Sequence, residues 1–271
     1  MDNRPIGIFD SGIGGLTSIP YLLRQLPKER IIFFGDTART PYGSKSVDTI
    51  RQFTLQIGKF MSANNVKMML VACNTISATS LDILRETYPD IPIIGTISPT
   101  SRVIANKCNG MDRIGIMATK ATVDSGVYIK KIQEKNYQLK NIYAKACPAL
   151  VPLIEEGIID NEIMDLTLRY YLDDFISENN IDTLVLACTH YPLIKANLAR
   201  LYPDISIISS SKEVAIAAKM ELEDRDMFAE GENGENYFYA SDLSDNFVRM
   251  IELILGKDQK ELNIEFQNLD I

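Results

Sequence analysis

Three pairs of similar segments recur in the same order along the chain, and this internal repeat limits the possible folds more than any other feature of the sequence. In one pair, Ala72-Cys73 and Ala187-Cys188 occupy equivalent positions. The offset between the paired segments is nearly constant, which favours an ancient duplication. We therefore expect two similar lobes. The paired segments are residues 69–75 with 184–190, 88–94 with 202–208, and 6–9 with 114–117.

Short apolar runs alternate with longer helical patterns through the first copy of the repeat. The runs at 6–9, 31–34 and 68–71 have the length of buried strands, and a helical pattern from about 48 to 64 separates the last two. Such alternation is typical of βαβ units whose parallel sheet is covered on both faces. The sequence predicts an α/β fold of two similar parallel-sheet lobes, related by pseudo-two-fold symmetry, with the active site in the cleft between them.

The boundary between the lobes is expected near residues 96–100, because Ser98-Pro99 disfavours continued regular structure there. The segment after residue 208 has no duplicate, and we assign it to the first lobe. The first lobe would then comprise residues 1–98 plus 209–271, and the second lobe residues 99–208. The unduplicated segment carries four local signals, which are a helix at 212–222, a turn at Asn233-Gly234, a strand at 237–240 and a helix at 245–255.

Charge and residue usage exclude several classes of function. The chain has 28 Lys and Arg residues against 36 Asp and Glu residues, a net charge of −8 without a basic cluster, so no nucleic-acid partner is expected. No apolar run approaches the length of a membrane span, and no signal-peptide pattern precedes the first apolar run, so we expect no membrane association and a cytoplasmic location. Four cysteines without C-x-x-C spacing and a single histidine predict reduced thiols and no metal site.

The loop from Asp10 to Gly15 superficially resembles a dinucleotide-binding fingerprint. The pattern G-x-G-x-x-G counted from Gly12 requires a glycine where this chain has Thr17, so no nicotinamide cofactor is predicted. The glycines instead free backbone amides to approach a small anion, with Asp10 and Ser11 offering side chains at the cleft. The alternative is that Asp10 or Ser11 simply caps a helix.

Cys73 and Cys188 end equivalent strands and precede equivalent helical patterns. The carboxyl ends of parallel strands carry ligand sites, and a helix N-terminus there favours a thiolate. Two lobes related by a pseudo-two-fold axis would bring the two thiols to opposite walls of one cleft. Such a pair suits inversion of a carbon, because one thiolate removes a proton from one face and the other thiol returns a proton to the opposite face. Cys108 and Cys147 lack this placement and are expected to be structural.

Two further segments are candidates for the same cleft. Asp36 and the Pro41-Tyr42-Gly43 turn follow the apolar run at 31–34 and should lie at the same sheet edge, although an ordinary surface turn would look similar. His190 is close enough to Cys188 to hydrogen-bond near its thiol, with a structural histidine as the alternative. Glu155 and Glu156 are ordinary solvated charges unless their segment faces the cleft.

At these residues the chain resembles the glutamate racemase family, within the aspartate/glutamate racemase superfamily. The resemblance covers almost the whole chain, and its motifs occur in the order of the family. The matching segments are residues 9–17, 35–43, 72–75, 147–148 with 151–155, and 188–193.

The resemblance implies interconversion of L- and D-glutamate without pyridoxal phosphate or metal, in a homodimer that supplies D-glutamate for peptidoglycan. It implies that Cys188 deprotonates L-glutamate and Cys73 deprotonates D-glutamate. The residues implied to hold the substrate's carboxylates and ammonium are Asp10, Ser11, Tyr42, Gly43, Asn74, Thr75, Thr189 and His190. Those implied to tune the thiols are Asp10, Asp36, Glu155 and His190.

Two segments depart from the family. Ser209-Ser210-Ser211 stands where the family usually has Asp-Ser-Gly, and the segment 117–122 replaces a glycine-richer turn, which leaves Thr119 and Thr122 as candidate contacts only. Three other functions remain open. They are racemisation of aspartate or another acidic amino acid, thiol hydrolysis or amidotransfer by Cys188 with His190, and amino-acid binding between two lobes without catalysis.

Overall fold

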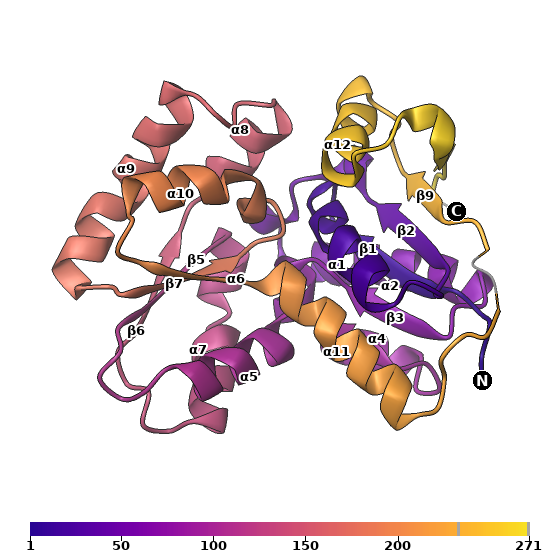
Figure 1. Cartoon of the computed structure of the whole chain (residues 1–271), viewed down its shortest axis with the longest axis horizontal. Coiled ribbons are helices and arrows are strands. Elements are labelled where there is room, and N and C mark those ends of the chain that lie inside the picture. The colour runs from indigo at the N-terminus through magenta and orange to yellow at the C-terminus, as the bar shows by residue number, and fades with distance from the viewer. Residues whose placement is uncertain (232–233, 270–271) are drawn as a thin grey trace.

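The computed structural model describes residues 1–231 and 234–269, and it contains two β-sheets that lie side by side (Figure 1). Every adjacent pair of strands is parallel. The larger sheet contains β1 (Ile6–Asp10), β2 (Ile31–Gly35), β3 (Met68–Val71), β4 (Ile93–Gly95), β9 (Tyr237–Ala240) and β10 (Asn263–Phe266). The smaller sheet contains β5 (Ile114–Ala118), β6 (Ile142–Ala146), β7 (Thr183–Ala187) and β8 (Ser206–Ser209).

The strand order shows the duplication directly. The larger sheet runs β10-β9-β2-β1-β3-β4, and its last four positions recur in the smaller sheet as β6-β5-β7-β8. The duplicated segments at 6–9 and 114–117 therefore lie in equivalent strands, β1 and β5, and the two Ala-Cys pairs lie at the carboxyl ends of equivalent strands, β3 and β7. The predicted α/β class with two similar parallel-sheet lobes is confirmed.

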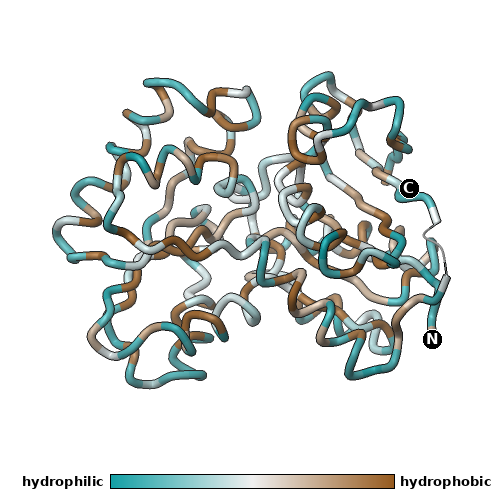
Figure 2. Tube along the Cα trace, viewed as in Figure 1, coloured by the Kyte–Doolittle hydropathy of each residue, from teal (hydrophilic) through white to brown (hydrophobic). Residues whose placement is uncertain are grey.

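Helices cover both faces of each sheet, so the central strands β1, β2, β3, β5 and β7 are buried on both sides. In β1, Ile6 and Ile8 pack into one core and Phe9 packs into a second core on the opposite face. In β7, Leu184 and Val185 separate in the same way between two cores. Figure 2 shows the resulting concentration of apolar residues in the strands at the centre of each lobe. A strand buried on both faces reads as a continuous apolar run, which is the pattern that predicted these elements.

The remaining elements are helices of two kinds. The α-helices are α1 (Ile19–Gln25), α2 (Val47–Ala63), α3 (Asn74–Thr79), α4 (Leu81–Thr87), α5 (Ile97–Lys107), α6 (Lys120–Asp124), α7 (Val127–Lys135), α8 (Leu150–Glu155), α9 (Glu162–Asn179), α10 (Lys195–Leu201), α11 (Ser210–Asp224) and α12 (Asp245–Leu255). The 3-10 helices are η1 (Gly14–Ser18), η2 (Thr37–Arg39), η3 (Tyr42–Ser44), η4 (Tyr191–Ile194) and η5 (Gln259–Glu261). Within the described residues, no helix is both long and apolar enough to cross a membrane.

The chain passes between the sheets twice, through the β4–α5 and β8–α11 connections. The expectation of irregular structure at Ser98-Pro99 was wrong, because α5 begins at Ile97 and continues through both residues. Proline is tolerated there since the first turn of a helix leaves its backbone N–H groups without intrahelical acceptors. At the second crossing, Ser209 is still paired in β8 and Ser210 is the first residue of α11.

The unduplicated tail adds two strands to the larger sheet. The strand predicted at 237–240 and the helix predicted at 245–255 are β9 and α12, and β9 pairs with β2. Sequence analysis missed β10, an edge strand whose residues are half-buried or exposed and which therefore lacks an apolar run. Asn233 of the predicted Asn-Gly turn lies outside the described residues.

A buried ion pair of the first lobe binds the segment that follows α11. Lys67 Nζ lies 2.7 Å from Glu29 Oε2, and the exposed fractions of the two side chains are 0% and 2%. The same ammonium donates to the carbonyl oxygen of Met227 at 2.6 Å, just beyond α11. The returning chain is therefore held by a charge that would be costly to leave unpaired in the interior.

Candidate active site

The candidate site is built at the carboxyl ends of strands from both sheets. Asp10 is the last residue of β1, Asp36 follows β2, and Cys73 lies two residues beyond β3. Cys188 directly follows β7 of the smaller sheet. Because all strands in each sheet are parallel, these residues gather at one edge of their sheet, where open α/β sheets carry their ligands.

Loops from both lobes line one small cavity of about 20 Å³. This volume has room for about one water molecule. Both Cys73 and Cys188 line it, so the structure brings the two predicted thiols to a single site. The full lining is Ser11, Thr40, Pro41, Tyr42, Gly43, Cys73, Asn74, Thr75, Thr119, Val151, Cys188, Thr189 and His190.

Cys73 is held by neutral hydrogen-bonding groups. Its sulfur lies 3.3 Å from Ser11 Oγ and accepts a hydrogen bond from the backbone N–H of Ile76 at 3.5 Å, so Cys73 caps the N-terminus of α3. Burial, together with the negative charge of Asp10, raises the pKa of the Cys73 thiol to about 12 despite these two hydrogen bonds. Cys73 is therefore protonated at neutral pH.

Cys188 lies beside a buried histidine and carboxylate pair. Its sulfur is 3.8 Å from His190 Nδ1, and His190 Nε2 is 2.9 Å from Glu155 Oε1 at the end of α8. Burial alone would lower the pKa of His190, but its hydrogen bonds to Cys188 and Glu155 and the charges of both groups raise that pKa to about 10. The imidazole is therefore a cation at neutral pH, and a cation next to a sulfur stabilises negative charge on that sulfur.

Asp10 lies behind the cavity and bridges the lobes. Its carboxylate accepts hydrogen bonds from Gly12 N at 3.0 Å and from Thr189 Oγ1 at 3.1 Å. Complete burial raises the pKa of Asp10 to about 6, although the charge of His190 and both hydrogen bonds oppose this shift. Asp10 thus contacts one substrate-site loop from each lobe.

Asp36 reaches the site only through another residue. It accepts hydrogen bonds from Arg39 Nε at 2.8 Å, from Ser241 Oγ at 2.7 Å and from the Tyr42 hydroxyl. Of these residues only Tyr42 lines the cavity. Among the described residues, the cavity lining includes all the predicted substrate-binding positions except Asp10, and it leaves out Asp36 and Glu155.

Several polar residues that sequence analysis missed support the lining residues. Asn74 Oδ1 accepts from the Tyr128 hydroxyl at 2.6 Å and from Thr96 Oγ1 at 3.0 Å, and Asn74 Nδ2 donates to Ser210 Oγ at 3.1 Å. Tyr128 is distant from the motifs, and nothing in its local sequence distinguishes it. Ser210 could have been found, because a run of serines at a strand-to-helix junction resembles the polar residues after the other strands.

Thr119 and Cys147 have different relations to the cavity. The Thr119 hydroxyl lies 2.9 Å from Thr75 Oγ1 and lines the cavity, whereas Thr122 lies behind it, 3.0 Å from Thr119 Oγ1.

Cys147 is fully buried in an apolar core of the second lobe, and this burial raises the pKa of its thiol to about 12. Among the described side chains, no group of three or more His, Cys, Asp or Glu residues could hold a metal ion.

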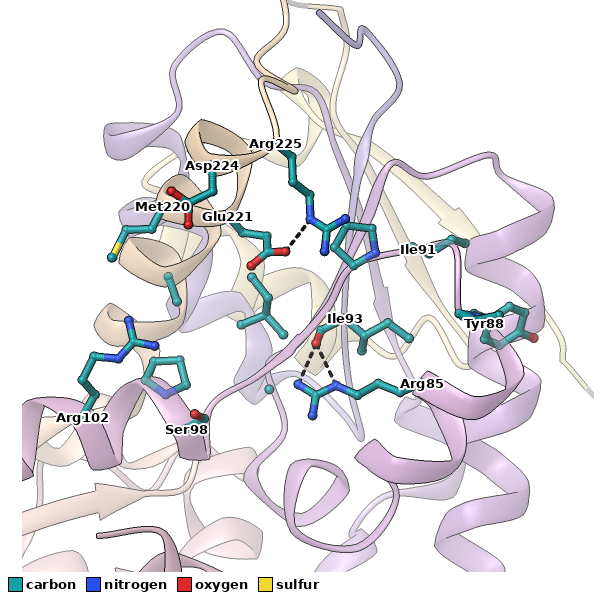
Figure 3. A pocket seen from close by; sticks show the side chains of 16 residues that line it. Arg85, Tyr88, Ile91, Ile93, Ser98, Arg102, Met220, Glu221, Asp224 and Arg225 are labelled. Carbon is teal, nitrogen blue, oxygen red and sulfur yellow. Dashed lines mark hydrogen bonds and ion pairs between the residues drawn. The ribbon is translucent and has the colours of Figure 1, made fainter. Parts of the chain in front are cut away.

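A larger cavity of about 500 Å³ lies away from the cysteines, between α4, β4, α5 and the C-terminal half of α11 (Figure 3). Its charged lining residues are largely engaged with the protein itself, since Arg85 donates to the carbonyl oxygen of Ile93 and Arg225 Nε lies 2.6 Å from Glu221 Oε1. None of the predicted site residues that the structure describes lines this cavity. The paired thiols therefore lie in the smaller cavity.

Two parallel-sheet lobes that each contribute a thiol to one small cavity define the chain as a two-lobed α/β protein with a site shared between its lobes. The sequence profile of the Asp/Glu/hydantoin racemases matches residues 18–218. The chain belongs to this family, and it is an amino-acid racemase, an isomerase.

Individual relatives match over nearly their whole length. The glutamate racemase of Persephonella marina is 42% identical over 93% of this chain and 94% of its own. That of a Sulfurihydrogenibium species is 41% identical over 98% of each. Among solved structures, the glutamate racemase of Francisella tularensis in complex with D-glutamate is 38% identical, with a TM-score of 0.91 over 100% of this chain and 99% of its own. The family resemblance noted in the sequence is confirmed.

Proposed function

We propose that this racemase interconverts L- and D-glutamate by acid and base catalysis between Cys73 and Cys188, without a cofactor. The observation that carries the proposal is that equivalent strand ends of the two lobes place both thiols on one cavity. The names of the relatives, and the D-glutamate held by the Francisella tularensis protein, support glutamate as the substrate.

The proposed reaction consists of two proton transfers. From L-glutamate, the Cys188 thiolate takes the α-proton, so that the Cα–H bond breaks, an S–H bond forms, and the electron pair spreads into the α-carboxylate. The Cys73 thiol then gives its proton to the opposite face of the same carbon and becomes a thiolate. From D-glutamate the two thiols exchange roles, and either direction leaves the enzyme ready for the other enantiomer.

The surroundings of the two thiols suit transfer from L-glutamate. Burial raises the pKa of Cys73, which favours its thiol form as the proton donor, and the positively charged His190 lies 3.8 Å from the sulfur of Cys188. Glu155 contributes by keeping His190 charged.

The loops would bind the substrate through their hydroxyl, amide and backbone N–H groups. Hydroxyl, amide and backbone groups from both lobes line the cavity and would face the substrate together. The proposed substrate contacts are Asp10, Ser11, Pro41, Tyr42, Gly43, Asn74, Thr75, Thr189 and His190.

Incubation in D₂O with each enantiomer of glutamate and of aspartate tests the proposal. Each inversion must place one deuterium at the α-carbon, which mass spectrometry and optical rotation follow together. We expect exchange and inversion of glutamate in the parent, and loss of inversion by at least about 10²-fold in Cys73→Ala and in Cys188→Ala. Absence of α-exchange with every acidic amino acid would rule out racemisation of this substrate class. Inversion that survives either single substitution would exclude the two-thiol mechanism, and turnover of aspartate alone would change the substrate.

Three further properties belong to the same proposal. The D-glutamate formed would supply peptidoglycan synthesis in the cytoplasm, and the chain would form a homodimer, which sedimentation equilibrium measures. We place the lobes at residues 1–98 plus 209–271 and at residues 99–208. Separate hydrogen-exchange protection of the two sheets would support this division.

A further inference from the structure

A three-residue hydrogen-bond chain joins the second crossing to the segment that carries Cys188. Thr17 Oγ1 lies 2.8 Å from Ser211 Oγ, 2.9 Å from the carbonyl oxygen of Thr189 and 2.9 Å from that of Gly14. The exposed fractions are 6% for Thr17, 0% for Ser211 and 2% for Thr189. Water therefore does not compete for these groups.

The direction of each hydrogen bond follows from the partners. Carbonyl oxygens only accept, so the single hydroxyl hydrogen of Thr17 must be directed at the carbonyls of Gly14 and Thr189. Thr17 then has no hydrogen left for Ser211, and Ser211 must donate to Thr17. The Ser211 hydroxyl thus orients the Thr17 hydroxyl, and Thr17 holds the Thr189 carbonyl.

This chain completes a two-point attachment of Thr189 to the first lobe. The Thr189 side chain donates to Asp10, and its carbonyl accepts from Thr17. Thr189 lies between Cys188 and His190 in the sequence, so fixing its backbone fixes the placement of both. The loop at Gly14 packs tightly against the same segment, because a Cβ atom there would lie 2.4 Å from Thr189 Oγ1.

We propose that Ser211 is a positioning residue for proton transfer by Cys188, acting through Thr17 and the backbone of Thr189. Ser211 touches none of the reacting groups. Its hydroxyl aligns the Cys188 sulfur with the substrate α-carbon across the boundary between the lobes, and it has no counterpart role at Cys73. This inference rests on the proposed racemisation, and its test uses the direction in which proton transfer is impaired.

The serine run at the second crossing offers a matched control. Ser209→Ala removes a buried hydroxyl two residues away, and Ser209 Oγ has no hydrogen-bond partner among the described atoms. It also does not cap α11 with its side chain. Ser211→Ala removes the hydroxyl that donates to Thr17, and Thr17→Val removes the next group in the chain while keeping the side-chain shape.

Isotope effects report which proton transfer has become slower. The α-deuterium of L-glutamate is removed by Cys188 and that of D-glutamate by Cys73, under the proposed mechanism. Since the enantiomers are equal in free energy, kcat/KM must fall equally in both directions whichever step is impaired. A slower Cys188 step instead raises the α-deuterium isotope effect on kcat/KM for L-glutamate and lowers it for D-glutamate.

We expect Ser211→Ala to lower kcat/KM about five- to tenfold, which corresponds to the loss of one neutral hydrogen bond. The α-deuterium isotope effect on kcat/KM should rise for L-glutamate and fall for D-glutamate. Thr17→Val should give the same skew, and the double variant should show no more than the larger single effect. Ser209→Ala should match the parent. Unchanged kcat/KM in Ser211→Ala, or a loss with the isotope effects of the parent, would overturn the proposal while parent racemisation still stands. If Ser211→Ala fails to fold, Thr17→Val decides by the same criteria.

Discussion

Each lobe contributes one half of the site, which contains Cys73 in the first lobe and Cys188 in the second. These two half-sites occupy equivalent places in the repeat but have different chemical surroundings. Cys73 is surrounded by a serine hydroxyl and a backbone amide, whereas Cys188 faces a histidine that is paired with Glu155. The difference arises because His190 comes from the second copy alone, where the first copy has Thr75. The repeat thus places the two thiols at equivalent positions, whereas the groups next to them differ.

Replacing one neighbour of each thiol gives the largest expected contrast between the half-sites. His190→Asn removes the cation beside Cys188, and we expect kcat to fall about 10²- to 10³-fold, as on removal of a charge-stabilising group from an active site. Ser11→Ala removes one neutral hydrogen bond from Cys73 and should lower kcat about tenfold. Steady-state racemisation of both enantiomers measures this contrast. Equal losses would show that the half-sites are equivalent despite their neighbours.

Asp10 contacts both half-sites, and its ionisation should cost stability. Burial raises its pKa from about 4 in the unfolded chain to about 6, so the ionised form is disfavoured in the fold by about 3 kcal/mol above that pH. Asp10→Asn cannot ionise. The free energy of unfolding of this variant should exceed that of the parent by about 3 kcal/mol at pH 8, and the two should converge near pH 4.

Urea denaturation at both pH values checks this expectation. Racemisation by Asp10→Asn should fall even as its stability rises, which would indicate that the buried carboxylate is retained for catalysis. Greater stability of the parent at pH 8 would show that the hydrogen bonds from Gly12 and Thr189 outweigh the cost of burial.

Glu155→Gln should change the pH dependence of the Cys188 half-site. The Glu155 carboxylate helps to raise the pKa of His190 to about 10, so its neutralisation lowers that pKa and the imidazolium is lost at lower pH. We expect the alkaline limb of kcat/KM to move down by about 1 to 2 pH units, the equivalent of one charged hydrogen bond. The adjacent exposed Glu156 provides the control, because Glu156→Gln should leave the profile unchanged. A shift of equal size in both variants would assign the effect to general surface charge.

Two glycines of the first lobe lie close to the second lobe, and replacing each of them gives the smallest expected difference between the half-sites. A Cβ at Gly14 would lie 2.5 Å from His190 Nδ1, whereas one at Gly43 would lie 2.7 Å from Thr119 Cβ. Overpacking of this kind costs about 1 to 3 kcal/mol. Gly14→Ala should lie at the upper end of this range and Gly43→Ala at the lower, as thermal unfolding measures. The reverse order would mean that the Cys188 segment yields more easily than the loop at Thr119.

Much of the fold was predictable because both copies of the repeat carry local patterns. Buried parallel strands such as β1 and β7 are continuous apolar runs, and β9 and α12 were predicted to the residue. Errors occurred where local pattern and tertiary context disagree. Pro99 lies in the first turn of α5, where proline is tolerated, and the edge strand β10 has too little burial to show an apolar pattern.

The candidate site was predictable to the extent that its residues lie in motifs. The motif residues Ser11, Tyr42, Asn74 and Thr189 all line the cavity with the two cysteines. Asp36 was predicted at the same sheet edge as a residue that tunes the thiols, and it reaches the cavity only through Tyr42. Tyr128 was missed, and Ser211 was noted only as part of a departure from the family, because each contacts its partner from an element far away in the sequence.

The sequence alone determined the repeat, the α/β class and the pairing of Cys73 with Cys188, because each of these depends on local order along the chain. Only the tertiary structure decided which groups surround each thiol. Hydrogen bonds and burial depend on contacts between distant segments, as between His190 and Glu155 or between Ser211 and Thr17. The equivalent placement of the thiols therefore follows from the repeat in the sequence, whereas their unequal surroundings depend on contacts that folding makes between distant segments of the chain.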